Sequence, residues 1–119
     1  MNKVALVVFA ESEGSHSDLA RVVNTLEVAK EFKDGGDEVE IIFDGAGVTS
    51  AVALADPENK RHRLYGAVQD KVSGVCAFCA KAFGVYEKAQ ALNIPLLDEH
   101  NKHPSLRTRV NKGYQVITF

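Results

Sequence analysis

Two cysteines draw attention because they are the only ones in the chain and lie three positions apart. Cys76 and Cys79 fall in the segment Val72–Val85, where a short apolar run turns into a helical pattern. A thiol reacts as the thiolate, and the free N–H groups at a helix N-terminus favour that charged form. Two cysteines in such a turn have Cα atoms about 5–6 Å apart, within reach of a disulfide. The segment therefore suits persulfide transfer, dithiol redox cycling or metal binding.

Other interpretations of the pair stay open on spacing alone. Both cysteines could be small buried side chains, since free cysteine is among the most buried residue types. A metal site would need more ligands, and His100 and His103 could supply them, although their spacing is tighter than usual for zinc. A dithiol oxidoreductase is a further alternative, although the pair follows the third predicted strand rather than the first. We assign no metal and no cofactor from the sequence.

Three more polar residues are candidates for a cleft around the cysteines. Glu11 and His16 lie in the polar loop after the first predicted strand, and Asp44 opens a glycine-rich turn after the second. The carboxyl ends of parallel strands meet at one edge of a sheet, where functional groups collect. The turn at Asp44 lacks the glycine spacing of a phosphate-binding loop, so a tight turn explains its glycines better.

The elements that must hold these residues follow from hydrophobic periodicity. The apolar run 3–10 predicts a strand buried on both faces of a parallel sheet. Ser15 and Asp18 have capping-box spacing and predict a helix that ends at Gly35-Gly36. Further strands are predicted at 38–43, 72–76, 96–97 and 114–119, and further helices at 48–55, 58–71, 77–83, 85–92 and 105–111. This order predicts an α/β fold in one domain over residues 1–119: a three-layer α/β/α sandwich with a mainly parallel five-stranded sheet.

Composition excludes several classes of partner. The chain of 119 residues has a net charge of -2 and no long run of basic residues, which argues against nucleic acid or an anionic membrane as the main partner. No segment approaches the ~18 apolar residues of a membrane span, and the first apolar run is too short for a signal peptide. We therefore expect a cytoplasmic protein, in which closely spaced cysteines are more often reactive than joined in a permanent disulfide.

The chain resembles the DsrE/DsrF-like family, the group of TusD- and YchN-like sulfur-relay proteins. The resemblance is carried by residues 41–48, Ile-Ile-Phe-Asp-Gly-Ala-Gly-Val, and by residues 75–85 around the cysteines. Cys76 stands eight residues before Gly84-Val85, the place of the family's sulfur-carrying cysteine. The resemblance implies an α/β/α sandwich that forms trimers or hexamers. It also implies that sulfane sulfur passes between donor and acceptor proteins as a cysteine persulfide.

The sequence departs from relay proteins in two ways. Lys81-Ala82-Phe83 stands where relay members often carry paired arginines, and Cys79 is an added thiol. A second thiol could attack a persulfide on Cys76, releasing sulfide and leaving a disulfide. Our first hypothesis is a sulfurtransferase-like sulfur carrier in which Cys76 is the nucleophile and Cys79 assists or resolves. The alternatives are a CxxC dithiol redox protein and a non-catalytic oligomeric binding module, the latter suggested by the apolar run 48–55.

Overall fold

Five strands form one sheet in the order β4-β3-β2-β1-β5, and every neighbouring pair is parallel. The computed structural model describes all residues, 1–119. The strands are β1 (Lys3–Val8), β2 (Glu38–Phe43), β3 (Val72–Cys76), β4 (Leu96–Leu97) and β5 (Gln115–Thr118). The predicted five-stranded sheet is therefore confirmed, and it is parallel throughout.

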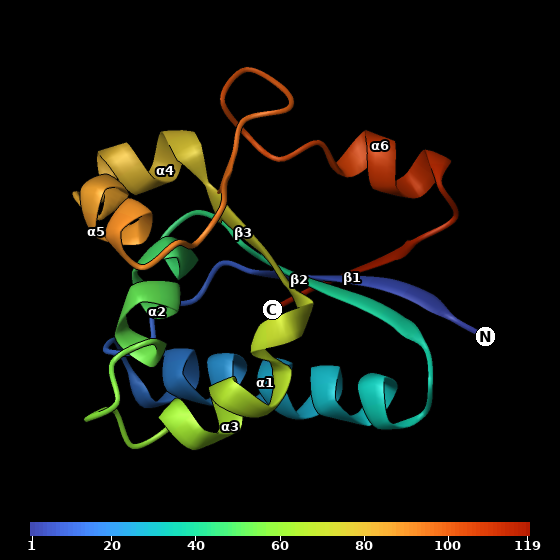
Figure 1. The fold of residues 1–119 in the computed structure, drawn as a ribbon, viewed down its shortest axis with the longest axis horizontal. Coiled ribbons are helices and arrows are strands. Elements are labelled where there is room, and N and C mark those ends of the chain that lie inside the picture. The colour runs from blue at the N-terminus through green and yellow to red at the C-terminus, as the bar shows by residue number, and fades with distance from the viewer.

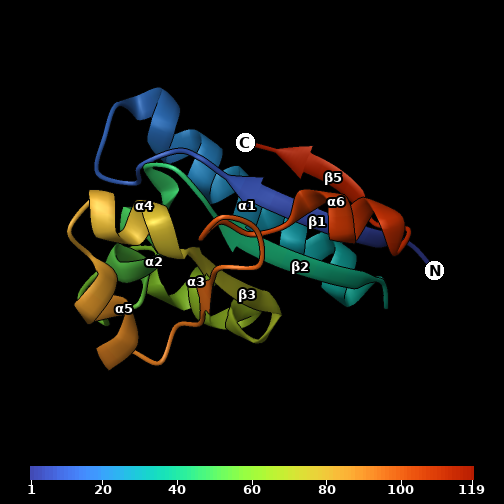
Figure 2. The same ribbon diagram turned by 90° about the horizontal axis from the view of Figure 1, so that it is seen from above.

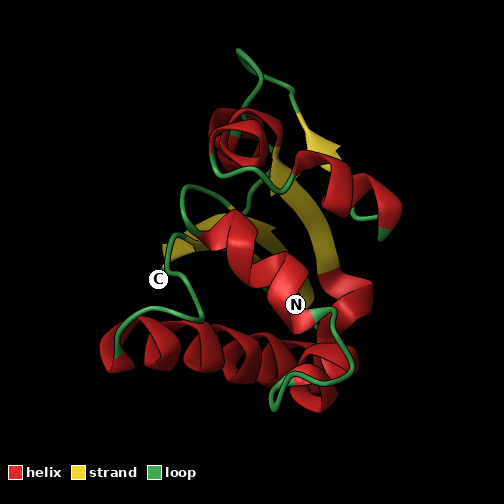
Figure 3. Cartoon of the chain, turned by 90° about the vertical axis from the view of Figure 1, so that its left-hand side faces the viewer, coloured by secondary structure: helices red, strands yellow, loops and turns green.

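The helices cover both faces of this sheet. They are α1 (His16–Asp34), α2 (Gly47–Leu54), α3 (His62–Val68), α4 (Ala77–Ala82), α5 (Tyr86–Ala91) and α6 (Leu106–Asn111). Helices α1 and α3 lie on one side of the strands and α6 on the other (Figure 1), and the side view shows the strands between helical layers (Figure 3). Helices α2, α4 and α5 gather beyond the carboxyl ends of β2 and β3, as both Figure 1 and Figure 2 show. This is the α/β architecture expected from the sequence.

Helix α1 is the longest helix and begins as predicted. The Asp18 N–H donates to Oγ of Ser15 at 3.1 Å, and the Ser15 N–H donates to Oδ2 of Asp18 at 3.3 Å. These two bonds form the capping box that the spacing indicated. Neither α1 nor any other helix has the length and apolar character needed to cross a membrane.

The helix predicted over 58–71 starts later than expected. Oδ1 of Asp56 accepts the Glu58 N–H at 2.9 Å, and Oδ1 of Asn59 accepts the Arg61 N–H at 2.8 Å. Such side-chain bonds two residues ahead favour turns over helix. Helix α3 therefore begins only at His62, and a short 3₁₀ turn, Gln69–Lys71, follows it.

The core is built on β1 and β2, whose apolar runs are buried on both faces. One set of their side chains forms a cluster with the apolar face of α1: Val4, Leu6, Val8, Val22, Leu26, Ala29, Ile41 and Phe43. The alternate residues Val7 and Ile42 are also fully buried. A continuous apolar strand is expected where both sheet faces are covered, and each such side chain stabilises the fold by about 1.5–3 kcal/mol.

Helix α2 lies inside the chain's own core. Val48, Ala51 and Leu54 are fully buried, and the helix contacts β2, β3, α4 and α5. The apolar run that suggested an oligomeric module is therefore covered by the chain itself. Gly47 fixes where this helix starts, because a Cβ there would lie 2.0 Å from the Val8 carbonyl oxygen. The close approach of α2 to the end of β1 also fixes the turn that carries Asp44.

Candidate functional site

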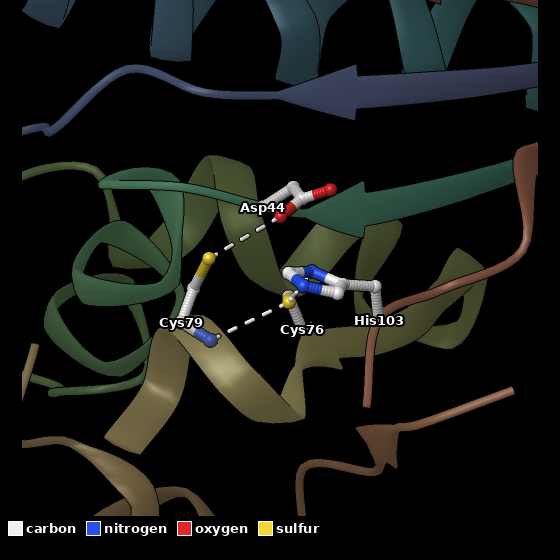
Figure 4. Close-up of side chains that lie close together, drawn as sticks. All are labelled: Asp44, Cys76, Cys79 and His103. Atoms are coloured by element: carbon white, nitrogen blue, oxygen red, sulfur yellow. Dashed lines mark hydrogen bonds between the residues drawn. The ribbon is translucent and has the colours of Figure 1, made fainter. Parts of the chain in front are cut away.

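Four side chains converge at the carboxyl ends of β2 and β3: Asp44, Cys76, Cys79 and His103 (Figure 4). Their ligand atoms all lie within 4.8 Å of one another, and we call them the thiol cluster. The sheet register explains why two of the four residues lie close together. Phe43 pairs with Val75, so the residues that follow them, Asp44 and Cys76, lie at the same level at the carboxyl end of the sheet.

Cys76 is the last residue of β3 and the N-cap of α4. Its Sγ accepts a hydrogen bond from the Cys79 N–H at 3.4 Å and lies 3.8 Å from the Lys102 carbonyl oxygen. The nearest ionisable partner is His103, whose Nδ1 is 3.1 Å from the same sulfur. The residue is fully buried. The sulfur is therefore held between a helix start and an imidazole.

The protonation of Cys76 differs from the sequence-based expectation. Burial raises the pKa of this thiol from 9.0 to about 12, and the charge of Asp44 acts in the same direction. The Cys79 N–H bond lowers the pKa but does not outweigh the loss of water. The helix start by itself therefore does not lower the pKa of Cys76 below its usual value. A reaction at Cys76 needs a base to take its proton, and Nδ1 of His103 is within hydrogen-bond reach.

Cys79 is the accessible thiol of the pair. It lies in the first turn of α4 and is only partly buried. Its Sγ donates to Oδ1 of Asp44 at 3.6 Å, and the same oxygen accepts the Gly45 N–H at 2.8 Å. The carboxylate is thus fixed by its own turn and holds the Cys79 sulfur in place. The two thiols have unlike surroundings, one buried beside an imidazole and one open beside a carboxylate.

A tight hairpin brings His103 to the cluster. His100 and His103 exchange two backbone hydrogen bonds of 2.8 Å around Asn101 and Lys102. Both central residues have left-handed backbones, with φ of 48° and 68°, as in the two-residue turns that join antiparallel strands. The Phe78 N–H donates to the Lys102 carbonyl at 2.9 Å, which fastens the hairpin to α4.

Packing fixes the orientation of the His103 ring. The Phe78 and His103 ring centroids lie 4.9 Å apart at a tilted angle. A cavity of about 490 Å³ opens beside this pair, and neither cysteine lines it. Its walls are formed by Ala77, Phe78, Lys81, Ala82, Tyr86, Asp98 and Lys102. Phe78 therefore lines this cavity and also contacts His103 of the thiol cluster.

A buried arginine holds the segment that carries His103. Nε of Arg109, on α6, donates to Oε1 of Glu40 on β2 at 2.6 Å. Its Nη1 donates to Oε1 of Glu99 at 2.6 Å, and that oxygen also accepts the Ser105 N–H at 2.9 Å. These bonds tie both ends of segment 99–105 to the sheet. Arg109 is therefore a positioning residue for the hairpin.

The structure joins some of the predicted site residues and leaves others apart. Asp44 joins both cysteines, whereas Glu11, in the loop after β1, and His16, the first residue of α1, are exposed and are not in the cluster. Of the two histidines, His103 enters the cluster and His100 is exposed on the hairpin. Two histidines spaced around Asn101-Lys102 are a weak hairpin signal. Nothing in the sequence around Arg109 marks its role.

Comparison with known proteins places this chain in a family. The model of the DsrE/DsrF-like family matches residues 3–119. The chain belongs to the DsrE/DsrF-like family. Membership of the DsrE/DsrF-like family supports a sulfur-relay type of function in general terms.

Two similar proteins extend the comparison of this DsrE/DsrF-like chain. It is 30% identical over 115 residues to the uncharacterized protein MJ0733 of Methanocaldococcus jannaschii, covering 97% of this chain and 93% of that protein. Its fold is similar to that of BT1422 from Bacteroides thetaiotaomicron, a conserved protein of unknown function, with a TM-score of 0.62 and 16% identity. That match covers 97% of this chain and 94% of the other.

Proposed function

We propose that the protein is a sulfur carrier that holds sulfane sulfur as a persulfide on Cys76. Cys79 is the thiol that receives the sulfur first, and His103 is the base that activates Cys76. The observation that carries the proposal is the 3.1 Å contact between Sγ of Cys76 and Nδ1 of His103. Membership of a family with sulfur-relay proteins supports the same class of reaction.

Sulfur enters through the accessible thiol. Cys79 attacks the outer sulfur of a donor persulfide, the donor's S–S bond breaks, and the donor leaves as a thiolate that takes the proton lost by Cys79. The Asp44 carboxylate, 3.6 Å from the Cys79 sulfur, orients this thiol for the attack. The product is a persulfide on Cys79, and no oxidant is consumed because the sulfane sulfur only changes its carrier.

The second transfer moves the sulfur to the buried position. With the ring proton on Nε2, Nδ1 of His103 accepts the Cys76 proton, and the Cys76 thiolate attacks the outer sulfur of the Cys79 persulfide. A new S–S bond forms on Cys76, and the departing Cys79 thiolate recovers the proton from His103. The persulfide is then shielded from stray thiols, because Cys76 is fully buried.

Intact-mass measurement tests this proposal. The reduced protein is incubated with a small persulfide donor and then treated briefly with glutathione, which removes exposed persulfides. We expect the wild type to retain one added sulfur atom, Cys76→Ser to retain none, and Cys79→Ser to load more slowly. A wild type without the added mass, or a Cys76→Ser variant that retains as much sulfur, would contradict the proposal. An inert Cys76 would favour the non-catalytic binding module instead.

A dithiol redox protein is the second candidate, favoured by the 3.4 Å bond from the Cys79 N–H to Sγ of Cys76. In that reaction Cys79 attacks the inner sulfur of a Cys76 persulfide, hydrosulfide leaves, and a disulfide forms that a thiol reductant must later restore. The same incubation separates the two functions. One equivalent of sulfide released with a loss of two hydrogens from the protein indicates the redox protein, and retained sulfur indicates the carrier.

A further inference from the structure

Independently of sulfur transfer, we propose that Asp44, Cys76, Cys79 and His103 form a binding site for a thiophilic divalent cation, Zn²⁺ above all. The sequence alone suggested a different set of ligands, the two cysteines with both His100 and His103. The structure separates the histidines and supplies a carboxylate in place of the second one. The proposal needs only the positions of these four ligand atoms.

The spacing of the cluster is close to what a tetrahedral ion requires. Zinc binds sulfur at about 2.3 Å and nitrogen or oxygen at about 2.0 Å, so its ligand atoms are about 3.3–3.8 Å apart. In the cluster, Sγ of Cys76 is 3.1 Å from Nδ1 of His103, and Sγ of Cys79 is 3.6 Å from Oδ1 of Asp44. Every other pair of ligand atoms lies within 4.8 Å. Movements of the ligand atoms by roughly 1 Å or less would therefore bring them to the distances of a tetrahedral zinc site.

The kinds of ligand select the ion. Two thiolates and an imidazole favour zinc over magnesium or calcium, which prefer oxygen ligands. Each thiol loses its proton to solvent when the cation binds, and four protein ligands fill the tetrahedron. Backbone hydrogen bonds stabilise the negative charge of two ligands. The Cys79 N–H donates to Sγ of Cys76, and the Gly45 N–H donates to Oδ1 of Asp44.

A cation can reach the site from solvent, and once bound it excludes sulfur loading. Asp44, Cys79 and His103 are each partly exposed, so a cation from solvent meets three ligands before it reaches Cys76. A bound cation occupies both sulfurs and the imidazole nitrogen. The metal-bound and sulfur-loaded forms of the protein therefore exclude each other.

Cobalt binding tests the site without any assay of sulfur transfer. Co²⁺ is added anaerobically to the reduced full chain, freed of metal beforehand with a chelator. Thiolate-to-cobalt absorption and the intensity of the visible d–d bands report the ligands and the geometry. We expect one Co²⁺ per chain with tetrahedral d–d bands, displaced by one Zn²⁺.

Single variants assign the ligands. Loss of an outer-shell partner of a metal ligand typically weakens binding 10–100-fold, so loss of a ligand should weaken it by more than about 100-fold. We expect this for Cys79→Ser, His103→Gln and Asp44→Asn, with the thiolate absorption roughly halved in Cys79→Ser. His100→Gln is the matched control and should bind as the wild type does. Circular dichroism confirms that each variant is folded.

Two results would overturn the proposal. One is weak octahedral bands without thiolate absorption in the wild type. The other is unchanged affinity in folded His103→Gln. Sulfur loading is measured on the chelator-treated protein, so a failure of the cation site and a failure of the sulfur carrier give different results.

Discussion

Sγ of Cys76 lies 3.1 Å from Nδ1 of His103, although 27 positions separate the two residues in the chain. One comes from the end of β3 and the other from the hairpin between β4 and α6. The contact pairs a thiol whose pKa is raised by burial to about 12 with the side chain best suited to take its proton. The reactivity of Cys76 therefore depends on a partner supplied by a distant segment.

The two thiols should differ strongly in their rate of alkylation. Cys79 is partly exposed, whereas Cys76 is buried and its pKa is raised from 9.0 to about 12. A rise of that size reduces the thiolate fraction on the order of a thousandfold. With limiting iodoacetamide at neutral pH, we expect label on Cys79 long before Cys76, measured by mass spectrometry of the two single-cysteine variants. Equal rates would show that Cys76 is not buried in solution.

His103→Gln should slow sulfur loading of Cys76 by about 10²–10⁴-fold, the usual contribution of a positioned base. The control is His100→Gln, which changes the other histidine of the same hairpin and should load at the wild-type rate. Single-turnover loading followed by intact mass gives both rates. If the two variants behave alike, His103 is not the base.

Arg109→Met should destabilise the fold by about 3 kcal/mol, because it leaves the largely buried carboxylate of Glu40 without its charged partner. The matched control is Lys30→Met, which breaks the exposed ion pair with Asp34 and should cost less than about 1 kcal/mol. Urea unfolding of both variants measures the difference. Similar losses of unfolding free energy in the two variants would show that the bonds of Arg109 to Glu40 and Glu99 do not hold the hairpin segment to the sheet.

Acid should weaken the anchor of the same hairpin. Burial alone would raise the pKa of Glu99, but hydrogen bonds from Arg109 and the Ser105 N–H outweigh it and lower the pKa below 4.5. Near and below pH 4.5 the unfolded chain then binds more protons than the folded one. The stabilisation that Glu99 contributes is complete above pH 4.5, and it is lost as the pH falls through the lower pKa of Glu99 in the folded chain.

Glu99→Gln isolates that acid effect from those of other carboxylates. We expect the variant to be less stable than the wild type at pH 7, and the gap between them to narrow as the pH is lowered below about 4.5. Urea midpoints across the pH range supply the comparison. A gap that stays constant with pH would rule out Glu99 as a source of the acid sensitivity.

The sequence predicted the fold well because its local signals agree with the tertiary structure. The unbroken apolar run of β1, the capping box at Ser15 and the glycines that end α1 all act over a few residues. The late start of α3 was missed because Asp56 and Asn59 form local turns that compete with helix. The burial of α2 depends on contacts with four other elements, which periodicity does not reveal.

The site was predictable only where strand order decides it. Asp44 and the cysteines lie at the carboxyl ends of adjacent strands, so they meet, whereas Glu11 in the loop after β1 and His16 at the start of α1 lie apart from them. The approach of His103 rests on two left-handed residues in a hairpin, and no local pattern indicates where a hairpin docks. The raised pKa of Cys76 follows from burial, which the helix pattern around it does not show.

The assignment of Cys76 as the sulfur carrier is tested most directly by locating the sulfur after loading with a ³⁴S-labelled donor. Cleavage after Lys71 and Lys81 gives one peptide, 72–81, that contains both cysteines, and its fragment ions distinguish them. Before glutathione treatment we expect a transient label on Cys79 at early times, and after the treatment we expect the label on Cys76. Label that remains on Cys79 alone, or a peptide without label, would contradict the assignment of Cys76 as the sulfur carrier.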